Sequence, residues 1–246
     1  MTTLVIGASG ATGKHLVEQL LKMGQQVKVI VRNSATLPQN WESNDNLILI
    51  RASISELSIL EMQSYLADCD SVASCLGHNL SFKGMFGQPR KLVTDSVRIL
   101  CEAIVASSPP KPIKFALMNT TAVRNGDMRE QVSLDQKLVL GLIHLLLPPH
   151  RDNEAAAEFL SSKIGQMNNY IKWVTIRPDT LINEKAVTDY EIYSSPTRSA
   201  LFNPGKTSRI NVGNFMARLL VEDEFWQKWQ GQMPVIYNLM NYNKEE

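Results

Sequence analysis

Short apolar runs alternate along the chain with longer stretches in which apolar residues recur at helical spacing. The short runs predict β-strands at residues 4–6, 27–31, 47–50, 71–76, 115–118 and 173–177. In the first helical stretch, Leu16, Leu20 and Met23 share one face. Strands that alternate with helices are typical of βαβ units, so we expect an α/β fold with a doubly wound parallel sheet.

Two segments depart from this alternation. Residues 122–151 are too long for a plain connection, and residues 187–207 are rich in Tyr, Ser and Pro and predict an irregular flap. Long connections in compact domains are often lids or binding loops. We therefore expect a single domain over residues 1–246, with two insertions and a small C-terminal elaboration that form the substrate side. The apolar run 138–147 would be a lid over an apolar substrate or a dimer surface, and its place in the chain favours the lid.

Composition and charge narrow the function classes. The chain is 44% hydrophobic and 20% charged, as globular proteins are. Its 25 Lys and Arg nearly balance its 24 Asp and Glu, so bulk charge favours neither nucleic acid nor a membrane surface as a partner. Three cysteines and no recognisable leader are typical of a reducing compartment. We expect a cytoplasmic protein that could form an oligomer.

A glycine-rich motif follows the first strand directly. Residues 7–13 read Gly-Ala-Ser-Gly-Ala-Thr-Gly and open the first helix. In a dinucleotide site, the first glycine permits a tight turn, the second lets the backbone approach a pyrophosphate, and the third lets helix and strand pack closely. The helix N-terminus adds amides and partial positive charge. The motif predicts a Rossmann-type dinucleotide site, and the alternative is a structural turn in a flavodoxin-like fold.

Arg32 stands at the end of the second strand. Enzymes that prefer NAD place an acid there, which accepts a hydrogen bond from the ribose 2′-hydroxyl. A guanidinium cannot accept that bond, but it suits a 2′-phosphate. Arg32 therefore predicts NADP(H) as the cofactor. The alternative is an arginine that extends into solvent at a strand end.

Several motifs together resemble the atypical short-chain dehydrogenase/reductases. They are the glycine loop, Val-Arg-Asn after the second strand, Cys75-Leu76-Gly77 after the fourth, and Arg177-Pro178 after the sixth. The similarity is greatest to the NAD(P)H-binding group that includes NmrA-like proteins and flavin/biliverdin-IXβ reductases, which also has a motif similar to residues 208–217. The resemblance implies a doubly wound fold, with the nicotinamide over the carboxyl ends of the fourth to sixth strands.

The same resemblance implies roles for individual residues. The pyrophosphate would be held by Gly7, Ser9, Gly10, Ala11, Thr12 and Gly13, and the adenosine phosphate by Arg32 and Asn33. Ser53 stands beside the adenine, where the family commonly has an acid. The ribose and nicotinamide would be lined by Cys75, Leu76, Gly77, Asn119, Pro178 and Thr180. Asn214 replaces the acid of the late motif.

The catalytic pair of most short-chain dehydrogenases is missing. In Tyr-x-x-x-Lys, the lysine lowers the pKa of the phenol for proton transfer. None of the six tyrosines has a lysine four positions later, and in the matching helix, 152–160, Glu154 stands near the lysine position. Ordinary carbonyl reduction is therefore disfavoured, as is a nucleotide-sugar epimerase, which needs the same pair.

Two functions remain possible for a chain without the Tyr/Lys pair. NADPH could pass hydride to a planar conjugated acceptor such as a flavin or quinone, because the delocalised anion can take its proton from solvent. Alternatively, the chain could sense NADP(H) without catalysis, as the NmrA-like resemblance permits.

Candidate proton donors are few. His78 is preferred because it follows Cys75-Leu76-Gly77 and should emerge near the nicotinamide, and the alternative is a solvated loop residue. Thr120 could bond a substrate oxygen. Further candidates are Lys83, His150, Tyr190 and Tyr193, whereas His144 fits a packed or interfacial position better. The four histidines and three cysteines lack zinc-ligand spacing, so we expect no metal.

Overall fold

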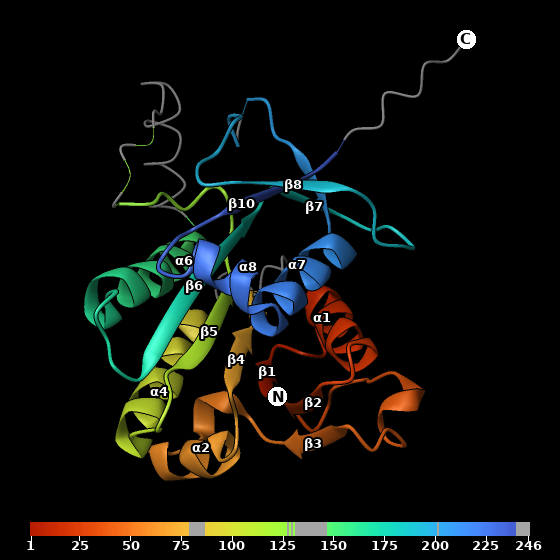
Figure 1. The fold of residues 1–246 in the computed structure, drawn as a ribbon, viewed down its shortest axis with the longest axis vertical. Helices are drawn as coiled ribbons and strands as arrows, with labels where there is room; N and C mark the ends of the chain where they lie inside the picture. Colours follow the sequence, from red (N-terminus) through yellow and green to blue (C-terminus); the bar gives the residue numbers. More distant parts are fainter. Residues whose placement is uncertain (79–86, 127, 129, 131–146, 201, 240–246) are drawn as a thin grey trace.

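A central sheet organises the molecule (Figure 1). The computed structural model describes residues 1–246 except 79–86, 127, 129, 131–146, 201 and 240–246. Eight strands follow the order β3-β2-β1-β4-β5-β6-β10-β8. The six predicted strands are β1 (Thr2–Ile6), β2 (Gln26–Val31), β3 (Leu47–Arg51), β4 (Ser71–Ser74), β5 (Ile113–Met118) and β6 (Ile171–Pro178). All neighbours among these six pair in parallel, which confirms the doubly wound fold.

The central strands are largely apolar because helices cover both faces of the sheet. Along β1, Val5 packs into one core cluster, whereas Leu4 and Ile6 pack into the other. The first cluster lies under α1 (Ala11–Lys22), α7 (Arg209–Val221) and α8 (Asp223–Trp229). The second lies under α2 (Ile59–Leu66), α4 (Leu92–Ser107) and α6 (Pro148–Glu158) (Figure 1). Single-turn elements are η1 (Gln39–Trp41), η2 (Ile54–Glu56) and the π-helical η3 (Phe159–Ile164).

The C-terminal part adds strands to this plan, in the upper part of Figure 1. β10 (Val235–Asn238) pairs in parallel with β6, and β8 (Tyr190–Tyr193) pairs antiparallel with β10. A separate small sheet joins β7 (Thr180–Ile182) to β9 (Lys206–Ser208). The prediction of an irregular segment over residues 187–207 is therefore wrong for β8. Its Tyr190 and Ile192 pack against the first core cluster, and that burial stabilises an extended conformation.

The helix that follows the glycine loop, α1, crosses α7 at close range. A Cβ on Gly213 of α7 would lie 2.8 Å from the Leu16 amide nitrogen and 2.9 Å from the His15 carbonyl carbon. Because a side chain there would meet backbone, the two helices can approach this closely only at a glycine. This crossing positions the first turn of α1.

In the described ranges, none of the helices combines the length and apolar character that a bilayer crossing would need.

Candidate functional site

Each of the three loop positions favours glycine for a different structural reason. Gly7 has φ +73°, and a Cβ there would lie 2.5 Å from the Cys75 carbonyl carbon. A Cβ on Gly13 would collide with the Gly7 carbonyl group. A Cβ on Gly10 would meet just one atom of the described chain within 4 Å, the Gly7 carbonyl oxygen at 3.1 Å. Packing of the protein therefore requires Gly7 and Gly13 most strongly, whereas Gly10 leaves space for another molecule to approach.

The N-terminus of α1 is open to an anion. Its N-cap is Gly10, which offers no side-chain acceptor, and its first turn contains no acidic residue. By contrast, Ser58 caps α2 and Ser208 caps α7. The first amides of a helix lack intrahelical partners and carry partial positive charge. An uncapped, acid-free helix start behind a glycine loop fits a phosphate group.

A cavity of about 350 Å³ lies against this loop. It lies at the carboxyl ends of β1 to β4, where the strand order reverses between β1 and β4. Doubly wound sheets bind ligands at this point. The cavity brings together nine of the predicted site residues: Gly7, Ser9, Gly10, Arg32, Ser53, Cys75, Leu76, Gly77 and His78. No lining residue in the described chain is Asp or Glu, so Arg32 gives the cavity a positive balance.

The other predicted residues do not line this cavity. Ala11, Thr12 and Gly13 form the first turn of α1, and Asn33 follows Arg32 beyond β2. The remainder lie further along the sheet, at or after the ends of β5 and β6: Asn119, Thr120, Pro178 and Thr180. The Asn119 side chain donates from Nδ2 to the Asn153 carbonyl oxygen at 2.8 Å, and the Thr120 hydroxyl accepts from the backbone amide of Ala122 at 3.3 Å. The cavity therefore reaches the ends of β1 to β4 but not those of β5 and β6.

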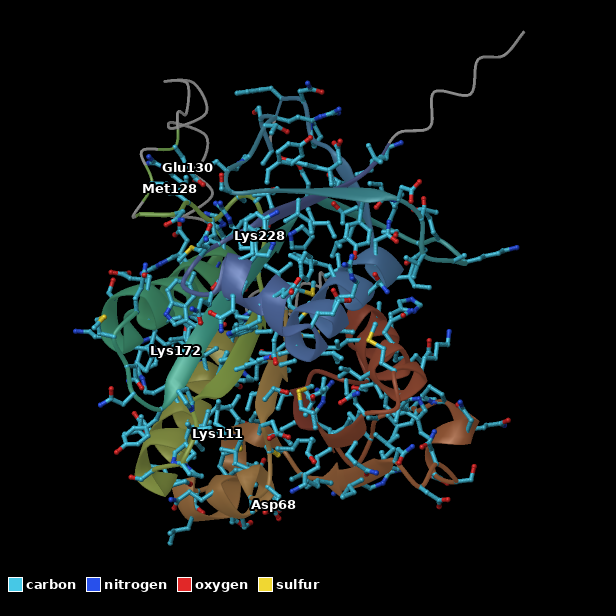
Figure 2. The ribbon with its side chains drawn as sticks, viewed as in Figure 1. Asp68, Lys111, Met128, Glu130, Lys172 and Lys228 are labelled. Atoms are coloured by element: carbon cyan, nitrogen blue, oxygen red, sulfur yellow. The ribbon has the colours of Figure 1, made fainter. Side chains whose placement is uncertain are left out.

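A larger opening of about 920 Å³ lies at the opposite end of the sheet. Asp68 and Lys111, which line it, are labelled in the lower part of Figure 2 and precede β4 and β5. It contains none of the predicted residues. Because ligands of doubly wound sheets bind at the carboxyl ends of strands, the smaller cavity is the better candidate.

Two arginines stand near the end of β2, and the structure distinguishes them. Arg51 lies opposite Val31 in the β2–β3 register, donates to the Asn33 carbonyl oxygen at 3.4 Å and lies 3.5 Å from a Glu42 carboxylate oxygen. The Arg32 side chain is exposed and makes no hydrogen bond or ion pair with the residues that the structure describes. Arg32 is therefore the arginine available to a ligand. Arg51 was not predicted, because only the strand register places it there.

His78 is not a solvated loop residue, so that alternative is wrong. Its side chain is 5% exposed, and its Nε2 lies 2.7 Å from Oδ2 of Asp152. Asp152, on α6, was missed by the sequence analysis. The two residues are 74 positions apart, and nothing in the local pattern links them.

The other candidate side chains take part in structural contacts. The Tyr190 hydroxyl donates to Asn214 Oδ1 at 2.8 Å, and Asn214 Nδ2 donates to Gln19 Oε1 at 3.2 Å. Position 214 thus needs both an acceptor and a donor, which explains an amide in place of an acid. Tyr193 donates to Glu191. His150 is buried, with Nε2 3.3 Å from Glu154 Oε1.

Lys83, His144 and residues 138–146 of the apolar run lie outside the described residues.

Arg177, from the Arg-Pro motif, holds two connecting segments to the sheet. It is fully buried, and its guanidinium donates to the carbonyl oxygens of Met233 at 2.7 Å and Val123 at 2.9 Å. It also contacts Glu130 Oε1 at 2.7 Å and the Ser194 carbonyl oxygen at 3.3 Å. Glu130 is labelled in the upper part of Figure 2. One side chain therefore holds the start of the 122–151 segment and the end of β8 to the sheet.

Two acidic groups near the site have raised pKa values. Burial raises the pKa of the Cys75 thiol to about 12, so its reactive thiolate is scarce at neutral pH. Burial also raises the pKa of Asp179, although the amides of Gly205 and Thr180 donate to its carboxylate and oppose the shift. Among the described residues, no three His, Cys, Asp or Glu side chains gather as metal ligands.

The fold is a Rossmann-like α/β fold, and comparison with known proteins gives the family. The profile of the NAD(P)H-binding family matches residues 7–223. The chain therefore belongs to this family, which confirms the resemblance drawn from its motifs.

Solved structures share the fold over most of this chain. The oxidoreductase ylbE from Lactococcus lactis has a TM-score of 0.68 and 16% identity, over 97% of this chain and 91% of that one. A proposed NADH-flavin reductase from Streptococcus pneumoniae has a TM-score of 0.66 and 15% identity, over 97% and 99%. A short-chain dehydrogenase/reductase from Veillonella parvula in complex with NADP has a TM-score of 0.67 and 12% identity, over 97% and 95%.

One curated protein is also similar in sequence. The hybrid PKS-NRPS synthetase pvhA of Talaromyces variabilis is 28% identical over 116 residues, which are 46% of this chain and 3% of that protein. The chain thus spans a small fraction of the length of this relative.

Proposed function

We propose that the protein is an NADPH-dependent oxidoreductase that passes hydride to a planar conjugated acceptor of the flavin or quinone type. The observation that carries the proposal is the cavity at the glycine loop. There an uncapped helix start and an uncommitted Arg32 offer positive charge, and no carboxylate stands among the described lining residues. The name of the Streptococcus pneumoniae neighbour and the NADP bound to the Veillonella parvula neighbour are consistent with it.

In this proposal, the cofactor lies along the carboxyl ends of the strands. Its pyrophosphate is bound at Gly10 and the first amides of α1, its 2′-phosphate at Arg32 with Asn33, and its adenine beside Ser53. The residues assigned to the ribose and nicotinamide are Cys75, Leu76 and Gly77 of the cavity wall together with Asn119, Pro178 and Thr180 further along the sheet. Thr120 would bond a substrate oxygen.

When bound, NADPH supplies a hydride from its nicotinamide ring. The contribution of the chain is to bind, to orient the two partners and to exclude water. A conjugated acceptor suits a site without a Tyr/Lys pair, because its anion is delocalised and does not need a strongly activated phenol.

We further propose that residues 1–246 act as one domain, that the substrate is a small planar molecule, and that the protein works in the cytoplasm. A second candidate is an NADP(H) sensor that catalyses nothing. The missing Tyr/Lys pair favours it as much as it favours a conjugated acceptor, so turnover has to distinguish the two functions.

The test is the consumption of NADPH, followed by its absorbance, with a panel of flavins and quinones. Steady turnover with at least one acceptor is the expected result, and Gly10→Val is the matched control that should lack it. Tight NADPH binding with no turnover of any acceptor would contradict the enzyme and support the sensor.

A further inference from the structure

The wall of the cavity continues past the end of β4. This β4 wall consists of residues 75–78, all of which line the cavity. The Cys75 amide donates to the Ile6 carbonyl oxygen at 2.9 Å, which continues the pairing of β4 with β1. Beyond it, Leu76 and Gly77 make no backbone hydrogen bond with another residue that the structure describes. Side-chain contacts are therefore needed to hold the wall beyond Cys75.

Asp152 of α6 makes such a contact. Its Oδ2 lies 2.7 Å from Nε2 of His78, the last residue of the β4 wall. The Asp152 side chain is fully buried, and that of His78 is 5% exposed. Hydrogen bonds are stronger in a buried setting than in water, so this bond can hold the wall against the helix layer.

Asp152 is itself held firmly by α4. Its Oδ2 also accepts from the Val93 amide at 2.8 Å, and its Oδ1 accepts from the Thr94 amide at 2.9 Å and from the Thr94 hydroxyl at 2.6 Å. Lys91, the N-cap residue of α4, offers no side-chain acceptor, so the carboxylate of Asp152 caps this helix instead. A side chain that is fixed by several bonds can fix another one in turn.

The next residue of α6 holds a second predicted site residue. The Asn153 carbonyl oxygen accepts from Nδ2 of Asn119 at 2.8 Å. Asn119 follows β5, which is the neighbour of β4 in the sheet. Two successive residues of α6 thus hold the chain just after two adjacent strands. Ligands of doubly wound sheets bind beyond such carboxyl ends.

We propose that Asp152 is a positioning residue of the nucleotide site, which acts through His78 to fix the β4 wall in the shape that binds the nucleotide. This inference rests on the proposed function. Asp152 does not line the cavity, so its effect on binding is indirect. Without the bond to His78, the wall adopts other shapes as well, and the apparent Kd rises by the inverse of the fraction that stays competent. The loss of one hydrogen bond changes that fraction by about tenfold.

The first measurement is titration calorimetry with NADPH and with NADH. His78→Leu removes the bond and leaves Asp152 with its partners on α4, so the Kd of both nucleotides should rise about tenfold. His78→Gln places an amide donor near the Nε2 position, so it should bind both within threefold of wild type. Binding within threefold by a folded His78→Leu would overturn the proposal. An equal loss in the two variants would also overturn it, because the imidazole itself would then be required.

A double-mutant cycle shows whether Asp152 acts through His78. Asp152→Ala should weaken binding about as much as His78→Leu, and the double variant should bind no more weakly than Asp152→Ala alone. The Tm should behave differently, because Asp152→Ala also removes the cap of α4 and should lower the Tm in either background. Additive losses of affinity would mean that the two side chains act separately, which contradicts the positioning role.

The third measurement needs no nucleotide. Cys75 belongs to the β4 wall, whereas Cys101 is buried in the second core cluster and does not line the cavity. In the ligand-free protein, mass spectrometry follows the labelling of each thiol by a maleimide at pH 8. Release of the wall in His78→Leu should speed labelling of Cys75 about tenfold relative to Cys101, and His78→Gln should not. No acceleration, or equal acceleration at both thiols, would overturn the proposal.

A control variant and the thiol measurement separate the possible failures. Thr94→Val removes one bond to Asp152 without touching the wall, so it should lower the Tm and leave both Kd values and Cys75 labelling unchanged. If Asp152→Ala does not fold, His78→Leu and His78→Gln still decide the proposal. If the wild type binds neither NADPH nor NADH, the proposed function fails, and Cys75 labelling by itself decides whether Asp152 and His78 hold the wall.

Discussion

Removal of the Arg32 charge should change which pyridine nucleotide the protein prefers. Arg32 is exposed at the cavity and has no partner to lose among the described residues, so Arg32→Gln leaves no buried group unpaired. A hydrogen bond to a charged group contributes about 1.5–3 kcal/mol. The expected loss of NADPH affinity is therefore roughly 10- to 150-fold, with the lower half of that range favoured by exposure. NADH lacks the 2′-phosphate, so its affinity should stay within about threefold.

The assay is a calorimetric or fluorescence titration of wild type and Arg32→Gln with NADPH and with NADH. Arg51→Gln is the matched control. That guanidinium lies one strand away and already contacts the Asn33 carbonyl oxygen and Glu42, so its removal should affect both nucleotides little. The Tm of Arg32→Gln should move by about one or two degrees at most, because surface substitutions change stability by roughly 0.5 kcal/mol.

Equal losses for NADPH and NADH would refute the reasoning, because they would mean that Arg32 does not contact the 2′-phosphate. An NADPH preference that disappears in Arg51→Gln and persists in Arg32→Gln would assign the phosphate to the other arginine.

Three further predictions follow from the glycines and the thiols. Gly10→Val should abolish NADPH binding in a titration while circular dichroism stays native, because its side chain fills the space before the loop; unchanged affinity would remove the cofactor from this loop. Gly213→Ala should lower the free energy of unfolding by about 1–3 kcal/mol and the Tm by several degrees, since its Cβ meets the α1 backbone. Gly126→Ala should not, because no atom of the described residues lies within 4 Å of its Cβ. Burial raises the pKa of Cys69 to about 11 and of Cys75 to about 12, and it raises that of Cys101 as well, so a thiol reagent at pH 8 should label the three cysteines only after denaturation. Fast labelling of the native protein would contradict their burial.

The amino-acid sequence alone was sufficient to predict the first six strands and the glycine loop. Most residues of the central strands are buried, so each strand contains a short apolar run that stands out from the surrounding helices, and even the partly exposed β3 keeps such a run. The loop is equally local, because its three glycines all fall within residues 7–13 and each has a separate structural reason. A pattern of this kind needs no knowledge of distant contacts.

The parts that were missed depend on contacts between distant residues. β8 is an edge strand whose Tyr190 and Ile192 are only half buried, so its pattern is weak. The role of Asn214 becomes clear only when Tyr190 and Gln19 are seen on either side of its amide. The Asp152–His78 contact joins α6 to the end of β4, and no periodicity predicts such a pair.

The central claim is that the cavity at the carboxyl ends of β1 to β4 binds a pyridine nucleotide with a 2′-phosphate. Titration calorimetry of the wild-type protein with NADPH and NADH tests it most directly. We expect heat of binding with both nucleotides and an affinity at least tenfold greater for NADPH. No heat and no rise in Tm at saturating concentrations of either nucleotide would contradict the claim.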